Sequence, residues 1–205
     1  MAEDKRANQT YHTSSGRDDY LTPVPYVKAA REVLVEIDLD PASCAFAQQE
    51  IKAKRWFGPG SPYSENGLKA DWAGRVLLNP PGGYAPIGSE TRSMANHWYL
   101  RLARFWGLGA VDAAIFVGFN IEIVRSGQIA GELSPAHFSM CFPAKRIPFD
   151  IECDGFRSTT TSPTHGCVIV CLTDQLDMAD RFSMMFERFG DVIVPMRLTA
   201  RRRSR

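Results

Sequence analysis

The stretch AGRVLLNPPGGY, residues 73–84, places a short apolar strand directly before an asparagine, two prolines and two glycines. Two consecutive prolines remove two backbone donors, fix two φ angles near about −65° and bias Asn79 toward extended geometry. Gly82 and Gly83 then allow a sharp turn or a close approach of another group to the backbone. The pattern predicts a buried strand over 75–79 that ends on a stiffly held amide, which is either a plain turn or a site that presents this amide.

Apolar runs typical of buried strands recur along the chain and alternate with amphipathic helices. Helices are predicted from Pro25 into the run VLVEIDLD (33–40), over 92–106, and over 175–189 with a stripe of Leu176, Ala179, Phe182, Phe186 and Phe189. Strands are predicted at the end of 33–40 and at 75–79, 113–120, 139–142, 146–149, 167–172 and 191–196. The segment 156–166 is rich in Ser and Thr and is predicted as a polar loop.

This alternation predicts an α/β fold, with an open, mostly parallel sheet covered on both faces and an antiparallel element toward the C-terminus. In such sheets ligands bind beyond the carboxyl ends of the strands. Two polar clusters, IDLDPAS (37–43) and NPPGG (79–83), fall at that kind of edge. Asn120 and Glu122 follow another predicted strand, where they either contact a ligand or cap a helix.

The composition is typical of a soluble globular protein, with 205 residues of which 44% are hydrophobic and 23% charged. We expect one domain over 20–196, a flexible polar segment at 1–19 and a basic tail at 197–205. No run approaches the roughly 18 apolar residues of a membrane span, and the first 19 residues lack the apolar core of a secretory signal. We therefore expect a cytoplasmic protein without a membrane partner.

Two further features bear on metals and partners. The chain has five cysteines and no CxxC pair, and Cys141, Cys167 and Cys171 lie in apolar runs, which predicts reduced, buried thiols. Because residues four apart on a strand are too distant to share one ion, we expect no metal site there. The last ten residues hold five arginines and no acid. Such a tail either binds nucleic-acid phosphates or is only a solubilising, disordered end.

An asparagine followed by two prolines directs its side-chain oxygen and a backbone carbonyl at one spot. Two converging acceptors suit an exocyclic amino group. An aromatic amine is a poor nucleophile because its lone pair is delocalised into the ring, and hydrogen bonds from both N–H groups favour the reactive pyramidal form. Such an amine is able to accept a methyl group from a sulfonium, for which orientation and proximity supply most of the remaining catalysis.

In this order, LTP (21–23), DLDPAS (38–43), AKRWF (53–57) and NGLKADWAGRVLLNPP (66–81) resemble the phage-type DNA N6-adenine methyltransferase (Dam) family. The likeness covers about residues 20–150. It implies a Rossmann-like methyltransferase fold that uses S-adenosylmethionine and methylates the N6 amino group of adenine in double-stranded DNA. The host cytoplasm is then the expected location of a phage-encoded enzyme.

The resemblance also implies roles for individual residues. Thr22 and Pro23 match a motif that lines the methionine end of the cofactor. Asp38 lies two residues before Asp40, the acid of the next motif, and is the second acid available there. That acidic motif after the first strand is matched by Asp40, Pro41, Ala42 and Ser43. Asn79, Pro80 and Pro81 match the catalytic tetrapeptide, whose oxygen acceptors hold the target amine.

Two departures from the family pattern concern the substrate. The family has an aromatic residue directly after the two prolines, where it stacks on the extruded base, whereas this chain has Gly82, and the nearest aromatic is Tyr84. Stacking on an aromatic contributes roughly 1 to 3 kcal/mol per base, so base capture depends on whether Tyr84 folds back. Asn66 stands where family members often have Asp, and its amide retains the capacity for contact with the adenine ring.

Two other functions stay open at this level. Gly82 is compatible with a catalytically impaired relative that binds DNA without turnover. The same tetrapeptide also serves methyl transfer to cytosine N4, to RNA bases and to glutamine amides. Target recognition is expected from the loop after Pro81, from 156–166 or from the basic tail.

Overall fold

The structure, a computed structural model, describes residues 20–87, 90–129, 138–159 and 165–195. The predicted flexible segment 1–19 and basic tail 197–205 lie outside these residues. The elements are α1 (Val24–Leu34), β1 (Leu39–Asp40), α2 (Gln48–Ile51), β2 (Arg55–Trp56), β3 (Gly74–Leu78), β4 (Tyr84–Ile87), β5 (Glu90–Ser93), α3 (Met94–Gly107), β6 (Val111–Gly118), α4 (Glu122–Ile129), β7 (Ser139–Pro143), β8 (Asp150–Cys153), β9 (Phe156–Thr159), β10 (Val168–Leu172), α5 (Leu176–Phe186) and β11 (Gly190–Ile193).

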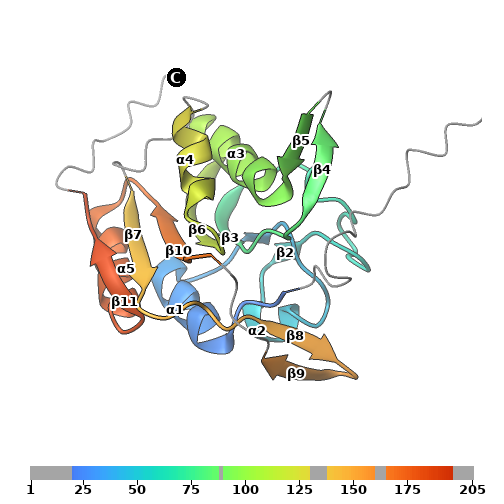
Figure 1. Cartoon of the computed structure of the whole chain (residues 1–205), viewed down its shortest axis with the longest axis horizontal. Coiled ribbons are helices and arrows are strands. Elements are labelled where there is room, and N and C mark those ends of the chain that lie inside the picture. Colours follow the sequence, from blue (N-terminus) through green and yellow to red (C-terminus); the bar gives the residue numbers. More distant parts are fainter. Residues whose placement is uncertain (1–19, 88–89, 130–137, 160–164, 196–205) are drawn as a thin grey trace, which may run out of the picture.

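A seven-stranded sheet in the order β11-β7-β10-β6-β3-β1-β2 forms the centre of the molecule (Figure 1). Strands β2, β1, β3 and β6 pair in parallel. Strand β10 runs antiparallel to both of its neighbours, β6 and β7, and β11 runs antiparallel to β7. Only β10 and β11 therefore oppose the common direction, which confirms the predicted mostly parallel α/β sheet with an antiparallel C-terminal element.

Both faces of this sheet are buried, which explains why its strands are almost continuously apolar. On β6, Ala113, Ile115 and Val117 pack with α1 and α5. The alternate residues Ala114 and Phe116 pack with α3 and α4 on the opposite face. Within the described residues, no helix combines the length and the apolar character that crossing a bilayer requires.

Three expectations about local structure are wrong. The segment 146–149 is irregular rather than a strand, because Pro148 has no N–H for a sheet ladder and Phe149 bonds locally to the Ile147 carbonyl. Residues 156–159 form β9, which pairs with β8 as a hairpin instead of a loop. Leu176 is 68% exposed because it begins α5, ahead of the part of the stripe that packs against the core.

The start of β1 is joined to the start of β3 by charged hydrogen bonds. The backbone N–H and the Nε of Arg75 both donate to Asp38 Oδ2 at 2.9 Å, and Asp38 N donates to the Arg75 carbonyl. Lys54 lies 2.9 Å from Asp38 Oδ1. Partial burial raises the pKa of Asp38, but the bonds from Arg75 and Lys54 outweigh it and hold that pKa well below its usual range.

Replacing Asp38 with Asn tests this contact. We expect Asp38→Asn to lower the free energy of unfolding by about 1 to 2 kcal/mol at neutral pH, because Arg75 loses a charged partner in a partly screened setting. A carboxylate with a lowered folded pKa stabilises above its unfolded pKa of about 4, and this contribution is lost as pH falls. The free energies of unfolding of the wild type and of Asp38→Asn, measured by urea denaturation, should therefore become equal in acid.

The control for this experiment is Glu36→Gln. Glu36 contacts the same two cations, Lys54 and Arg75, but is exposed to solvent. Its replacement should change stability much less than that of Asp38. Equal effects of the two substitutions would contradict a specific role for Asp38.

Candidate functional site

A cavity of about 390 Å³ lies at the carboxyl ends of β1 and β3. Strands β2 and β3 lie on opposite sides of β1, so the sheet reverses its direction of growth here. In open α/β sheets such a switch point is where ligands bind, and this volume is within the range of small-molecule sites. The predicted site residues that line it are Thr22, Asp40, Pro41, Ala42, Ser43, Asn66, Asn79 and Pro81.

Asp40 is the last residue of β1 and is only 3% exposed although it borders the cavity. Its Oδ2 accepts a hydrogen bond from Gln48 Nε2 at 2.9 Å, and its Oδ1 accepts one from Ala42 N at 3.4 Å. Burial raises the pKa of Asp40 to about 6, and the bonds from Ser43, Ala42 and Gln48 only partly offset this rise. A carboxylate with a raised pKa in a cavity is typical of a functional site.

Asn79 follows β3 and is oriented by the N-terminal part of the chain. Its Nδ2 donates to the Tyr20 carbonyl at 2.8 Å, which assigns the nitrogen and oxygen of the side-chain amide. The next residue, Leu21, forms a two-way backbone bridge with Asp150 at the start of β8. Arg157 on β9 donates to the Thr22 carbonyl and forms an ion pair with Asp150 at 3.2 Å. The β8–β9 hairpin therefore holds the segment that orients Asn79.

The loop that contains Asn66 forms one wall of the cavity. Asn66 Oδ1 accepts a hydrogen bond from Leu68 N at 3.0 Å, so its oxygen serves the loop's own turn. A Cβ on Gly67 would lie 1.9 Å from the Pro41 carbonyl oxygen, which leaves room for glycine alone. Trp72 Nε1 donates to the Gly67 carbonyl at 2.8 Å. The loop around Gly67 therefore packs directly against the acidic motif 40–43.

Several predicted site residues lie outside the cavity lining. Asp38 bonds to Arg75 at the opposite end of β1. Pro23 precedes α1 as its N-cap, and Pro80 is buried. Gly82 does not border the cavity either.

Tyr84, whose return over Asn79 the sequence leaves open, is not among the residues that line the cavity. Gly83 has a φ of 82°, and the chain turns there into the β4–β5 hairpin. Tyr84 is the first residue of β4, and its side chain is 67% exposed. Figure 1 shows this hairpin projecting from the body of the molecule.

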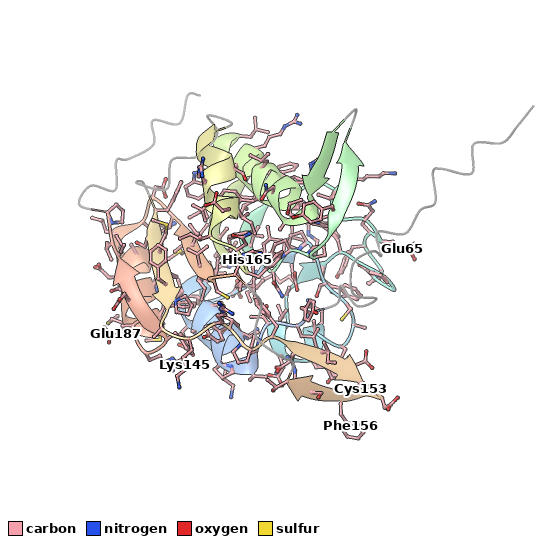
Figure 2. The ribbon with its side chains drawn as sticks, in the orientation of Figure 1. Glu65, Lys145, Cys153, Phe156, His165 and Glu187 are labelled. Carbon is pink, nitrogen blue, oxygen red and sulfur yellow. The ribbon has the colours of Figure 1, made fainter. Side chains whose placement is uncertain are left out.

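The cavity has further lining residues that sequence reasoning missed, among them Tyr20, Phe57, Glu65, Leu68, Met94 and Trp98. In Figure 2, Glu65 lies in view between the β4–β5 hairpin and the β8–β9 hairpin that carries Cys153 and Phe156. Trp98 belongs to the apolar stripe of α3. Such a stripe does not tell a residue that lines a cavity from one that is packed in the core. No sequence signal singles out Tyr20, because its contribution to the orientation of Asn79 comes from its backbone.

The remaining polar candidates have structural roles. Asn120 Oδ1 accepts a hydrogen bond from Glu122 N at 3.0 Å, as a helix cap does. Cys141, Cys167 and Cys171 are buried free thiols, as predicted, and burial raises the pKa of each. Among the residues described, no three His, Cys, Asp or Glu side chains gather as a metal site would need.

Comparison of the chain with family models, curated proteins and solved structures returns no match. Among the lining residues, the buried Asp40 and the half-buried Asn79 have polar side chains that hydrogen bonds hold in place at the cavity.

Asp40→Asn tests whether the buried carboxylate lowers stability. Since the proton is bound more tightly in the folded state, the stability of the wild type falls as pH rises from about 4 through 6. Asn resembles the neutral acid, so Asp40→Asn should raise the free energy of unfolding by about 2 kcal/mol at about pH 8. Urea denaturation should show this gain disappear in acid.

The control is Asp180→Asn on the exposed side of α5, which should leave stability nearly unchanged. A loss of stability in Asp40→Asn at about pH 8 would contradict a destabilising effect of the ionised Asp40 carboxylate.

Proposed function

We propose that this chain is an S-adenosylmethionine-dependent methyltransferase that modifies the N6 amino group of adenine in double-stranded DNA. The observation that carries the proposal is the orientation of Asn79. Its nitrogen is held by the Tyr20 carbonyl at a cavity that also borders Asp40, where parallel strands β1 and β3 end side by side. Asp40 and Asn79 lie in two of the stretches that resemble the Dam family, 38–43 and 66–81.

The cavity suits the proposed cofactor in charge and in shape. Asp40 supplies a buried carboxylate, which favours a cationic group such as an ammonium. Phe57, Leu68 and Trp98 supply apolar surface for a nucleoside. Thr22 and the residues 41–43 complete the lining. When bound, S-adenosylmethionine supplies a methyl group activated by its sulfonium.

The protein's own contribution is to bind and orient the amine. Because Asn79 Nδ2 is engaged by Tyr20, the amide oxygen is the atom left to accept a hydrogen bond from the target amino group. The two prolines hold the backbone after Asn79 extended, so that a carbonyl is available as a second acceptor. Two acceptors localise the lone pair on the nitrogen of the amine and orient it toward the methyl group. This lowers the barrier to methyl transfer without a strong base.

Two alternatives to this proposal are a DNA-binding protein without turnover and a methyltransferase with another acceptor. The exposure of Tyr84 and the glycine at position 82 favour the first, because neither supplies a stack for the base. Calorimetric titration with S-adenosylmethionine separates it, since a protein that has lost the cofactor site should give no heat. Comparing DNA, RNA and protein as methyl acceptors tests the second.

The enzymatic proposal is tested by methyl transfer with Asn79 variants. The wild type should transfer tritium from labelled cofactor to double-stranded DNA and form N6-methyladenine detectable by mass spectrometry. Asn79→Ala removes an acceptor made for the transition state, and we expect kcat to fall by roughly 100- to 1000-fold. Asn79→Asp keeps an oxygen but loses the donor to Tyr20, so it should be nearly as impaired.

Cofactor affinity is the control for these variants, and it should change little because Asn79 is assigned to the amine. A wild type that binds cofactor but transfers no methyl group to any nucleic acid would overturn the proposal. Transfer by Asn79→Ala at the wild-type rate would remove Asn79 from the mechanism.

The pH dependence of cofactor binding tests Asp40. A cationic ligand favours the ionised carboxylate, whose pKa is raised to about 6 by burial. Affinity for S-adenosylmethionine should therefore fall as pH decreases below about 6, by up to about tenfold per unit. Calorimetry in buffers of different ionisation heat should detect proton release on binding. In Asp40→Asn the affinity should be weaker and independent of pH in this range; an unchanged pH profile would separate Asp40 from the cofactor.

A further inference from the structure

Gly82, directly after the two prolines, has room for a side chain. A Cβ built on Gly82 meets one atom of the described residues within 4 Å, which is Cζ of Phe119 at 3.9 Å. The distance is an ordinary van der Waals contact, so nothing in the packing requires glycine at this position. The chain then turns at Gly83 into β4, which begins at Tyr84. One side of this space is therefore bounded by the ring of Phe119.

Phe119 comes from the strand next to Asn79 in the sheet. Strands β3 and β6 pair in parallel with Leu78 opposite Phe116, so both chains leave the sheet at the same edge (Figure 1). Asn79 is one residue beyond this pair, and Phe119 is three residues beyond it on the neighbouring strand. This placement brings the ring beside the proline pair.

The backbone around Phe119 is fixed on both sides. Gly118 pairs with Val168 in the antiparallel ladder of β6 and β10. Two residues after Phe119, Ile121 N donates to the Gly166 carbonyl at 3.1 Å. Phe119 therefore stands on a rigid part of the fold, whereas Tyr84 stands on the projecting hairpin.

The ring of Phe119 is only partly buried. It packs against the apolar clusters on both faces of the sheet, yet part of its surface stays accessible. A residue that closes the end of the core and still exposes aromatic surface is suited to stacking with a planar ligand.

We propose that Phe119 is the aromatic residue that receives the extruded base, in the space over Gly82 beside Asn79. The assignment rests on the proposed function and deepens it by naming the base-binding residue. A base taken out of the duplex needs a stacking surface to compensate for lost stacking in DNA. Gly82 has no ring and Tyr84 is 67% exposed on the β4–β5 hairpin, whereas the ring of Phe119 reaches the position of a Gly82 side chain.

The test compares Phe119→Leu, Phe119→Tyr and the double variant Phe119→Leu with Gly82→Tyr. Leu retains apolar bulk for the core but has no ring, so kcat/KM for double-stranded DNA free of N6-methyladenine should fall by roughly 5- to 150-fold. Tyr retains the ring and should restore most of the loss. In the double variant, a ring from position 82 enters the same space and should recover part of it, which a purely structural role of Phe119 does not explain.

The controls are the dissociation constant for S-adenosylmethionine and the thermal unfolding midpoint, which should stay close to wild type in Phe119→Leu. If the wild type methylates DNA and Phe119→Leu matches its kcat/KM, the assignment of Phe119 is overturned while the proposed function stands. A loss that neither Phe119→Tyr nor Gly82→Tyr relieves also overturns the assignment. If the wild type binds cofactor and methylates no nucleic acid, the proposed function fails and this assignment fails with it.

Discussion

The arrangement of the site depends on the parallel pairing of β1 with β3. The pairing is short, with Leu39 opposite Val76, and the Asp38–Arg75 contact secures it at the amino end. A slip of one residue would exchange the sheet faces of either strand, so a charged contact that sets the register is strongly constraining. With the register set, the two strands end together and bring Asp40 and Asn79 to one cavity.

A second constraint comes from the segment 20–23, which connects distant parts of the chain. Its backbone accepts a hydrogen bond from Asn79 and forms a bridge with Asp150, and Arg157 secures it from β9. Because these bonds use backbone atoms, they position Asn79 with little dependence on the side chains of the segment. The β8–β9 hairpin thus contributes to the site without lining it.

The buried Asp40 and the cavity that it borders both oppose stability. A carboxylate held at 3% exposure opposes its own ionisation, and the cavity beside it forgoes packing contacts. Natural proteins depart from local packing and charge rules mainly at functional sites. Both departures here lie at the same edge of the sheet, whereas the core beneath it is densely apolar on both faces.

Sequence reasoning predicted what depends on neighbouring residues. The apolar run of β3, its end at Asn79 and the α/β alternation follow from hydrophobic periodicity and from the φ restrictions of proline, which act locally. The tertiary structure decided the rest. Asp38 bonds to Arg75, Tyr84 begins a hairpin strand and is 67% exposed, and Phe119 lies beside Gly82. The contacts of a half-buried side chain depend on which strand lies next to its own strand. Strand order depends in turn on the packing of the whole chain, so it cannot be read from neighbouring residues.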